Sequence, residues 1–492
     1  MRGLRAHATQ EPSPTLQTTY HGEDWSALWI GLVIFILSLG AAVGLDVVGF
    51  GVTTAVWTDA AKAFAPVSKN FAVLGGFGSL AATYVFLLAV MTIGARAIRL
   101  QTGRFAIGFT IIFWAAMVTY ALGNIAFVAA TPNQLGIFKI PWSLGLTGEA
   151  GYIVALIAGL IVGNLFPRAA GFLQTATRPE WFVKTAIIVL GAFLGVQAAS
   201  ATNIAGAILF RGFAAIVEAY LIYWAVVYFI ARKFFRFSRE WAAPLASGIS
   251  ICGVSAAIAT GAAIRARPII PVMVSSLVVI FAVVELLILP FAAQTWLVRA
   301  PMVAAGWMGL AVKTDGAAVA SGTITDGLIR AKALALYGVN YKEGWMLLTT
   351  TSVKVFIDIF IGVWSFVLSL IWVYGINREK GEQVKASEIW DRFPKFILGY
   401  VLTFVVMLGL ALASPGLLTA ARAASAEANA FRVVFFVLTF FSIGLVSNFR
   451  QLWREGFGKL AAVYAVSLFG FVIWVGLGIS FVFFNGLVPP TA

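Results

Sequence analysis

The chain has 492 residues, of which 61% are hydrophobic and 11% are charged. A mean hydropathy of +0.94 excludes a soluble globular protein, because a soluble core does not bury so many apolar side chains. The net charge of +14 does not indicate a nucleic-acid surface, since the basic residues form short clusters between long apolar segments. The composition therefore predicts an all-α polytopic membrane protein whose partner is the lipid bilayer and not nucleic acid.

Several classes of chemistry are excluded by the residues that the sequence lacks. Cys252 is the only cysteine, so no internal disulfide forms. His7 and His21 are the only histidines and lie before the first apolar segment, which rules out a histidine-based catalytic or metal site within the membrane. A phosphate-binding GxxxxGK[ST] motif is also absent. We therefore expect no enzyme activity, metal or cofactor, and any active transport must use an H+ or Na+ gradient.

Polar and proline-containing residues 1–24 are expected to form a disordered cytoplasmic tail. About 11 apolar segments then follow, each close to the roughly 20 residues that span a bilayer. They are residues 25–43, 71–95, 105–130, 147–166, 181–199, 212–230, 268–290, 344–374, 396–413, 431–446 and 460–484. Residues 25–104 form an N-terminal two-helix region, residues 105–484 a transporter core, and residues 485–492 a C-terminal tail.

Lysine and arginine in short loops indicate how the chain is oriented, because an excess of them marks the cytoplasmic side. Clusters occur at residues 96–104, 168–184, 232–239, 378–395 and 450–459. The loop TPNQLGIFKIPWSLGL and the tail NGLVPPTA are nearly uncharged. The pattern predicts a cytoplasmic N-terminus and a C-terminus on the opposite side.

Two segments, residues 241–264 and 301–322, differ from ordinary spans. The first contains SGISICGVSAAIATG, which is rich in glycine and hydroxyl side chains. The chain must pass from the inside near Arg239 to the outside before Gly344. Either both segments and residues 268–290 all cross, or only residues 268–290 cross and the two segments are re-entrant hairpins. We favour the hairpins, which keep Arg265 and Arg267 inside.

The two unusual segments also resemble each other. SAAIATG at residues 255–261 matches GAAVASG at residues 316–322 with four identical and three similar positions. Small residues can recur in this way in tight helix contacts. The alternative is an internal repeat whose two copies enter the membrane from opposite sides, as in inverted-repeat transporters.

A break within the first segment predicts a site for an anion. A helix that restarts inside the membrane leaves N–H groups exposed, with about half a positive charge at its N-terminus. Gly253 lets a ligand approach the backbone, while Ser250 and Ser255 supply hydroxyl groups. Cys252 lies at the break, where it is either part of the site or a small packed residue.

The second segment carries ionisable residues at membrane depth, which are costly enough to indicate function. Lys313, Thr314 and Gly316 are candidates for binding the anion, and Asp315 for a proton or Na+. Pairing of Lys313 with Asp315 is the alternative. Glu218 and Glu285, inside other spans, are candidates for relaying protons.

Other charged residues carry less information. Lys354 and Asp358 are four residues apart, so we expect them to neutralise each other on one helix face. Glu149 and Lys184 lie near the ends of spans, where their side chains are expected to extend toward water.

The segments GLIVGNLFPRAAG, WFVKTAIIVLGAFL, SGISICGVSAAIAT, VKTDGAAVASG and FFSIGLVSNFRQLWREG occur in this order. Together they resemble the YeiH-type sulfate exporters of the bacterial inner membrane, over residues 105–484. SICG is the most specific of these landmarks. The resemblance implies a secondary active exporter of a small oxyanion such as sulfate, located in the inner membrane.

Two departures from that family bear on the substrate. Its members usually carry a His-Glu pair where this chain has Lys313 and Thr314, followed by Asp315. The N-terminal two-helix region also lies outside the resemblance and could serve dimerisation. Organic sulfonates, carboxylates and bicarbonate remain alternative substrates. An anion channel, and a membrane enzyme or its structural partner, are the alternatives to a transporter.

Overall fold

The computed structural model describes residues 16–377, 384–447 and 458–491. Residues 1–15 of the expected tail, and the expected basic residues at 378–383 and 450–454, lie outside these ranges. Among the described residues, ten helices are long and apolar enough to cross a membrane. The number is eleven if α6 (Ala150–Leu165) and α7 (Pro167–Leu173), which are bent by 111°, form one span. The expected all-α polytopic architecture is confirmed.

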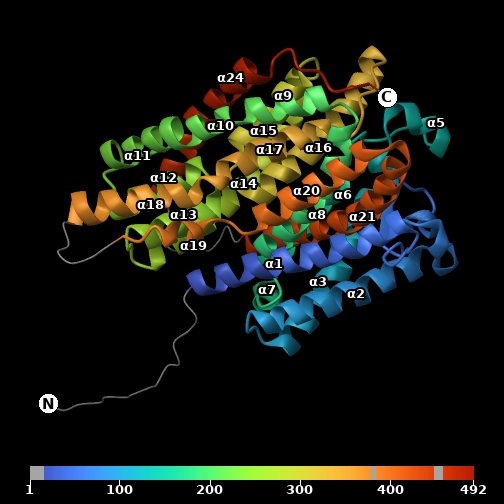
Figure 1. Ribbon diagram of the computed structural model, residues 1–492, viewed down its shortest axis with the longest axis horizontal. Helices are drawn as coiled ribbons and strands as arrows, with labels where there is room; N and C mark the ends of the chain where they lie inside the picture. Colours follow the sequence, from blue (N-terminus) through green and yellow to red (C-terminus); the bar gives the residue numbers. More distant parts are fainter. Residues whose placement is uncertain (1–15, 378–383, 448–457, 492) are drawn as a thin grey trace.

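The helices form two bundles that lie side by side (Figure 1). In the first, which we call the scaffold bundle, α8 lies at the centre and contacts α1, α20 and α21. The remaining members pack around this group. The scaffold bundle consists of α1 (Leu16–Leu39), α2 (Gly75–Ala97), α3 (Thr102–Gly123), α6, α8 (Pro179–Ala199), α20 (Phe396–Ala413) and α21 (Pro415–Val446).

The second bundle, which we call the hairpin bundle, contains both unusual segments. In chain order its members are α9 (Thr202–Gly212), α10 (Ala214–Val217), η5 (Glu218–Tyr223), α11 (Trp224–Lys233), α12 (Arg239–Ser250), α13 (Gly253–Ala263), α14 (Ile269–Trp296), α15 (Pro301–Ala311), α16 (Asp315–Tyr337), α17 (Trp345–Ile359), α18 (Ile361–Leu370), η6 (Ile371–Asn377), α23 (Gly458–Ser467), η7 (Leu468–Val472) and α24 (Ile473–Phe484). Some of its outer helices are interrupted by π-helical turns, as α10 and α11 are by η5.

Short elements connect these helices. Strands β1 (Val52–Thr54) and β2 (Phe64–Pro66) form an antiparallel ribbon in which Thr53 lies opposite Ala65. The other short elements are η1 (Gly40–Val43), η2 (Ala60–Lys62), η3 (Lys69–Leu74), α4 (Ala126–Ala129), η4 (Pro132–Gln134), α5 (Leu135–Phe138) and α19 (Ser387–Arg392). The ribbon, between α1 and α2, was not foreseen from the sequence.

Several boundaries differ from those expected; the span expected at residues 212–230, for example, begins at Thr202. Helix α1 begins at Leu16, within the tail that was expected to end at residue 24. At the end of the expected tail, Glu23 pairs with Arg178 at 2.9 Å and Asp24 with Lys184 at 2.6 Å, so these two residues belong to the packed helix. Helix α21 begins at Pro415, where Ser414 caps it, and not at residue 431. The helix in the second half of the second unusual segment continues beyond residue 322 to Tyr337.

Close approach of α6 to α21 explains one glycine-rich stretch of the scaffold bundle. A Cβ atom at Gly159 would collide with the carbonyl of Phe441, and one at Gly444 would collide with the carbonyl of Leu156. Both helices therefore meet backbone to backbone. Such small-residue contacts are the usual way in which helices associate within a membrane.

Candidate functional site

The first unusual segment is a hairpin whose two ends lie at the same end of the molecule. Arg267, just after α13, donates its backbone N–H to Glu240 at the start of α12, at 2.8 Å. Farther along, the hydroxyl of Thr260 on α13 donates to that of Ser247 on α12 at 2.7 Å. We call residues 239–263 hairpin 1 and its turn, Ile251 and Cys252, tip 1.

The second unusual segment is also a hairpin and enters from the opposite end. Arg299, before α15, donates to the Tyr337 hydroxyl at the end of α16 at 3.1 Å. After hairpin 2 the chain passes beside the C-terminal residues, because the backbone N–H of Lys342 donates to the carbonyl of Pro490 at 2.8 Å. We call residues 301–337 hairpin 2 and its turn, residues 312–314, tip 2.

Helix α14 joins the base of hairpin 1 to the base of hairpin 2. Its 28 residues give a length of about 42 Å, which exceeds the hydrocarbon thickness of about 30 Å. This connection matches the expectation in which residues 268–290 cross and the two neighbouring segments return.

The two tips touch each other inside the hairpin bundle. Gly253, at the start of α13, donates its N–H to the carbonyl of Lys313 in tip 2 at 2.8 Å. The Cys252 thiol donates to Asp315 Oδ1 at 2.8 Å. A Cβ atom at Gly253 would collide with Val278 and come within 2.9 Å of Thr314 Cγ2. Glycine is required there because α14 and tip 2 press against the backbone.

The start of α13 has the features expected of an anion site. Its N-cap residue Cys252 makes no capping hydrogen bond to the helix. The hydroxyl of Ser250 is buried and lacks a hydrogen-bond partner among the described residues. Ser255 is buried on the same short helix. In contrast, α16 is capped, because Thr314 accepts a hydrogen bond from the N–H of Ala317 at 3.2 Å.

Lys313 does not point toward the start of α13. Its ammonium donates to the carbonyl of Leu310 and lies 4.3 Å from the centre of the Tyr223 ring. Glu218 and Glu285 both interact with its charge, and Glu285 accepts a hydrogen bond from the Lys313 N–H at 3.2 Å. All three are buried. The structure thus gathers Lys313, Glu218 and Glu285 into one cluster, which we call the lysine–glutamate cluster.

Lys354 lies between the two tips, a position for which the sequence analysis proposed no residue. Its ammonium donates to the carbonyls of Ile251 at 2.8 Å and Lys313 at 3.0 Å. It also lies 3.5 Å from Asp315 and 4.0 Å from Asp358. The expected ion pair between Lys354 and Asp358 is therefore present but is not self-contained, since the ammonium lies closer to Ile251, Lys313 and Asp315.

A second expectation that fails concerns Lys184. Its side chain is fully buried in α8, with the ammonium 2.6 Å from Asp24, and does not extend toward water. Lys184 and Glu180 also interact electrostatically with Asp315 across the bundle boundary. The boundary is close there, because a Cβ atom at Gly316 would lie 3.2 Å from Val183 Cγ2.

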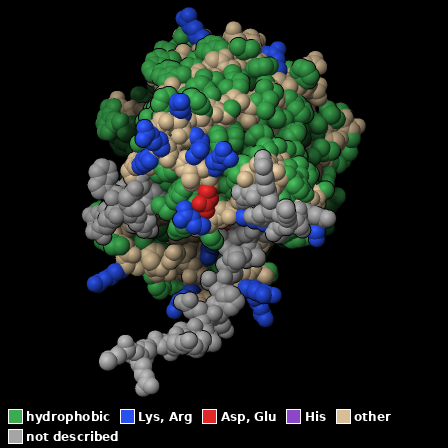
Figure 2. All heavy atoms as spheres, turned by 90° about the vertical axis from the view of Figure 1, so that its left-hand side faces the viewer, with side chains coloured by type: hydrophobic (Ala, Val, Ile, Leu, Met, Phe, Trp, Pro, Cys, Tyr) green, Lys and Arg blue, Asp and Glu red, His purple; other side chains and the backbone are tan. Residues whose placement is uncertain are grey.

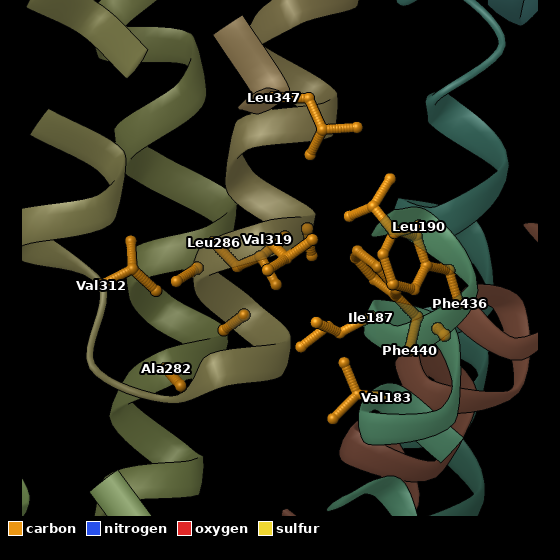
Figure 3. Close-up of a cluster of buried hydrophobic side chains, with 14 of the residues drawn as sticks. Val183, Ile187, Leu190, Ala282, Leu286, Val312, Val319, Leu347, Phe436 and Phe440 are labelled. Atoms are coloured by element: carbon orange, nitrogen blue, oxygen red, sulfur yellow. The ribbon is translucent and has the colours of Figure 1, made fainter. Parts of the chain in front are cut away.

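The middle of the boundary between the bundles is apolar. Figure 3 shows Val183, Ile187 and Leu190 of α8 pointing toward side chains of the hairpin bundle, among them Val319 and Leu347. Phe436 and Phe440 of α21 complete this surface on the scaffold side. Apolar surfaces make no directional bonds, so they can shift against each other with little loss of specific contacts.

A polar cavity of about 220 Å³ opens along the same boundary. The hairpin bundle contributes Thr323, Asp326, Glu343, Gly344 and Leu347. Thr54, Val56, Tyr120, Asn124, Gly148, Glu149, Tyr152, Asn429, Arg432 and Val433 line it from the scaffold side. Glu343 is exposed, with 63% of its side chain accessible. Leu347 belongs to both the cavity and the apolar cluster of Figure 3.

Comparison with known proteins gives one family. Residues 145–463 match the family model described as Conserved hypothetical protein 698. A UPF0324 membrane protein of Nitrosomonas europaea is 41% identical over 95% of this chain and 96% of its own length. A UPF0324 membrane protein of Rhodopirellula baltica is 27% identical over 77% of this chain and 63% of its own length.

An uncharacterized protein of Archaeoglobus fulgidus is 47% identical over 29% of this chain and 87% of its own length. No solved structure matches the chain. Since the Nitrosomonas alignment covers 95% of this chain, it includes most of the N-terminal two-helix region, which lies before the residues matched by the family model.

The lysine–glutamate cluster predicts a specific stability pattern. Lys313→Met removes the positive charge that acts on Glu218 and Glu285, so we expect the free energy of unfolding to fall. Adding Glu218→Gln and Glu285→Gln should restore most of it, because neutral side chains need no cation. Thermal unfolding of detergent-purified protein measures both, with Lys62→Met, at an exposed lysine, as the control. A triple variant no more stable than Lys313→Met contradicts the assignment.

Proposed function

Because the chain belongs to the UPF0324 family of membrane proteins, the family that the SICG landmark indicated, we propose that it is a secondary active transporter. Its cargo in this proposal is a small oxyanion such as sulfate, exported at the expense of an ion gradient. One observation carries the proposal: two opposed hairpins meet at their tips within one bundle, and that bundle borders the other through an apolar surface.

Alternating access follows from this division of the molecule. Inverted-repeat transporters bind substrate between broken helices and move one bundle against the other around that site. Here both broken helices belong to the hairpin bundle, so the tips can travel as one body past α8 and α21. The cavity lies on one side of the apolar cluster, and Leu347 stands where the two meet.

An anion would bind at the start of α13, which has no side-chain cap and where the Ser250 hydroxyl lacks a partner among the described residues. The negative charges around the tips restrict when an anion can bind there. Asp315 and Asp358 are buried beside Lys354, so the two carboxylates outnumber the one ammonium there. Protonation of these carboxylates would remove the repulsion. The proposal therefore takes H+ as the coupling ion and Asp315 and Asp358 as the groups that carry it.

The alternative of an anion channel fits the boundary less well. A channel needs a continuous wet path, whereas buried apolar side chains fill the space between the cavity and the tips (Figure 3). Organic sulfonates, carboxylates and bicarbonate remain alternative cargoes. They share a delocalised negative charge that N–H groups and hydroxyls can bind.

We also propose that the chain lies in the bacterial inner membrane with its N-terminus in the cytoplasm and its C-terminus in the periplasm. Figure 2 looks onto the end of the molecule at which α1 begins, and lysine and arginine side chains gather there. Exposed Arg96, Arg99 and Arg104 lie at the end of α2, in the following loop and at the start of α3, and Lys233 lies at the end of α11. An excess of basic residues is typical of the cytoplasmic side.

Uptake of radiolabelled sulfate into proteoliposomes tests the function, with pH and Na+ gradients imposed separately. We expect uptake that saturates, follows the pH gradient and is reduced by unlabelled competing anions. Current that rises linearly with voltage and needs no gradient would identify a channel instead. If sulfate is not taken up under either gradient, the same assay with labelled sulfonates, carboxylates and bicarbonate identifies the cargo.

Orientation is tested by thiol labelling of intact cells carrying Arg265→Cys or Val488→Cys in a Cys252→Ser background. Arg265 follows hairpin 1, and Val488 lies near the C-terminus in an exposed position. A reagent that does not cross membranes should label Cys at 488 and not at 265. The reverse pattern would contradict the proposed orientation, and labelling of both would contradict the proposed placement of hairpin 1.

A further inference from the structure

The ammonium of Lys354 lies at the ends of two broken helices. Its two carbonyl partners follow the last residues of α12 and α15, at Ile251 and Lys313. The last carbonyls of a helix have no partner within it, and the helix dipole places about half a negative charge there. The Ile251 carbonyl is such a group, because Ile251 is the C-cap residue of α12. The Lys313 carbonyl lies in the turn, one residue beyond the α15 C-cap Val312, and adds a second oxygen that attracts a cation.

Two carboxylates complete the surroundings of this point. Asp315 Oδ1 lies 3.5 Å from the ammonium and Asp358 Oδ1 lies 4.0 Å away. The Cys252 thiol, Asp315 and Asp358 have donor atoms within 4.8 Å of one another, close enough to surround one ion. Carbonyl and carboxylate oxygens are the ligands that hard cations prefer. We call this set of oxygens the tip cage.

Other charged groups stand farther from the tip cage. Lys313 and Glu285 interact with Lys354 from the lysine–glutamate cluster, while Glu180 and Lys184 of α8 interact with Asp315 from the scaffold bundle. The contacts of the Lys354 ammonium below 3.5 Å that the structure gives are to the two tip carbonyls. The ammonium is therefore held by the oxygens that would hold a bound ion.

We propose that the tip cage is a monovalent-cation site that this chain fills with its own lysine. Broken transporter helices use the same groups, exposed carbonyls and helix C-terminal ends, to bind Na+. With Lys354 in place, the tips are joined without a free ion. With Lys354 removed, the cage is open to Na+. The inference rests on and deepens the proposed function, since it assigns the reason why Na+ is not the coupling ion.

The test measures stability in detergent, so its outcome does not depend on whether the protein transports an anion. Lys354→Ala is purified in NaCl, exchanged into LiCl, NaCl or choline chloride at equal ionic strength, and unfolded thermally. We expect Na+ or Li+ to raise the Tm of the variant to a saturating value that is roughly 2 °C or more above the Tm in choline chloride. Choline serves as the reference because this cation is too large to enter the cage. Wild-type protein should show no such difference.

Two further variants make the result specific. Lys62→Ala removes an exposed lysine of η2, outside the tip cage, and it should show no response to Na+. Lys354→Ala with Asp358→Asn removes one carboxylate from the cage and should weaken the response. An equal response in wild type overturns the inference. So does the absence of a response in Lys354→Ala, or failure of that variant to fold even in NaCl, because Na+ then cannot replace the ammonium.

Discussion

Helix ends that stop inside a membrane impose the constraint on which the rest of this structure depends. Water is not there to bond to the last carbonyls of α12 and α15, so each must find a partner within the protein. Lys354 supplies one ammonium to the carbonyl of Ile251 at the end of α12 and to that of Lys313 in the turn after α15, and the N–H of Gly253 shares the carbonyl of Lys313 with it. Hairpins that enter from opposite ends are thereby fixed to each other at their tips.

This bond between the tips explains why the molecule divides as it does. Because both hairpins are tied together, they belong to one bundle with α14 and α17, and the side chains drawn at the centre of the boundary to the scaffold bundle are apolar (Figure 3). Charged partners of the scaffold bundle are instead joined to each other, as Asp24 is to Lys184. A transporter that moves one body past another requires this separation of fixed and sliding contacts.

Much of the fold could be predicted from the sequence because it depends on local patterns. Apolar length gave the spans, and the glycines and hydroxyls around SICG predicted a break between Ser250 and Ser255, which the structure has at Ile251 and Cys252. Partners distant in the chain could not be predicted. Lys354 and Asp358 look self-sufficient at a spacing of four residues, but the carbonyls that hold Lys354 come from residues 103 and 41 positions away. Likewise, Lys313 was expected at the anion site, but it lies with Glu218 and Glu285.

Movement of the hairpin bundle past the scaffold bundle can be tested by a disulfide across the boundary. A Cβ atom at Gly316 would lie 3.4 Å from Val183 Cβ, close to the spacing of about 3.8 Å in disulfides. Gly51→Cys with Ala430→Cys, at 3.3 Å, provides a control link within the scaffold bundle. In a Cys252→Ser background, oxidation of Val183→Cys with Gly316→Cys should stop anion uptake reversibly while the control remains active. Undiminished uptake by fully cross-linked protein would contradict the account.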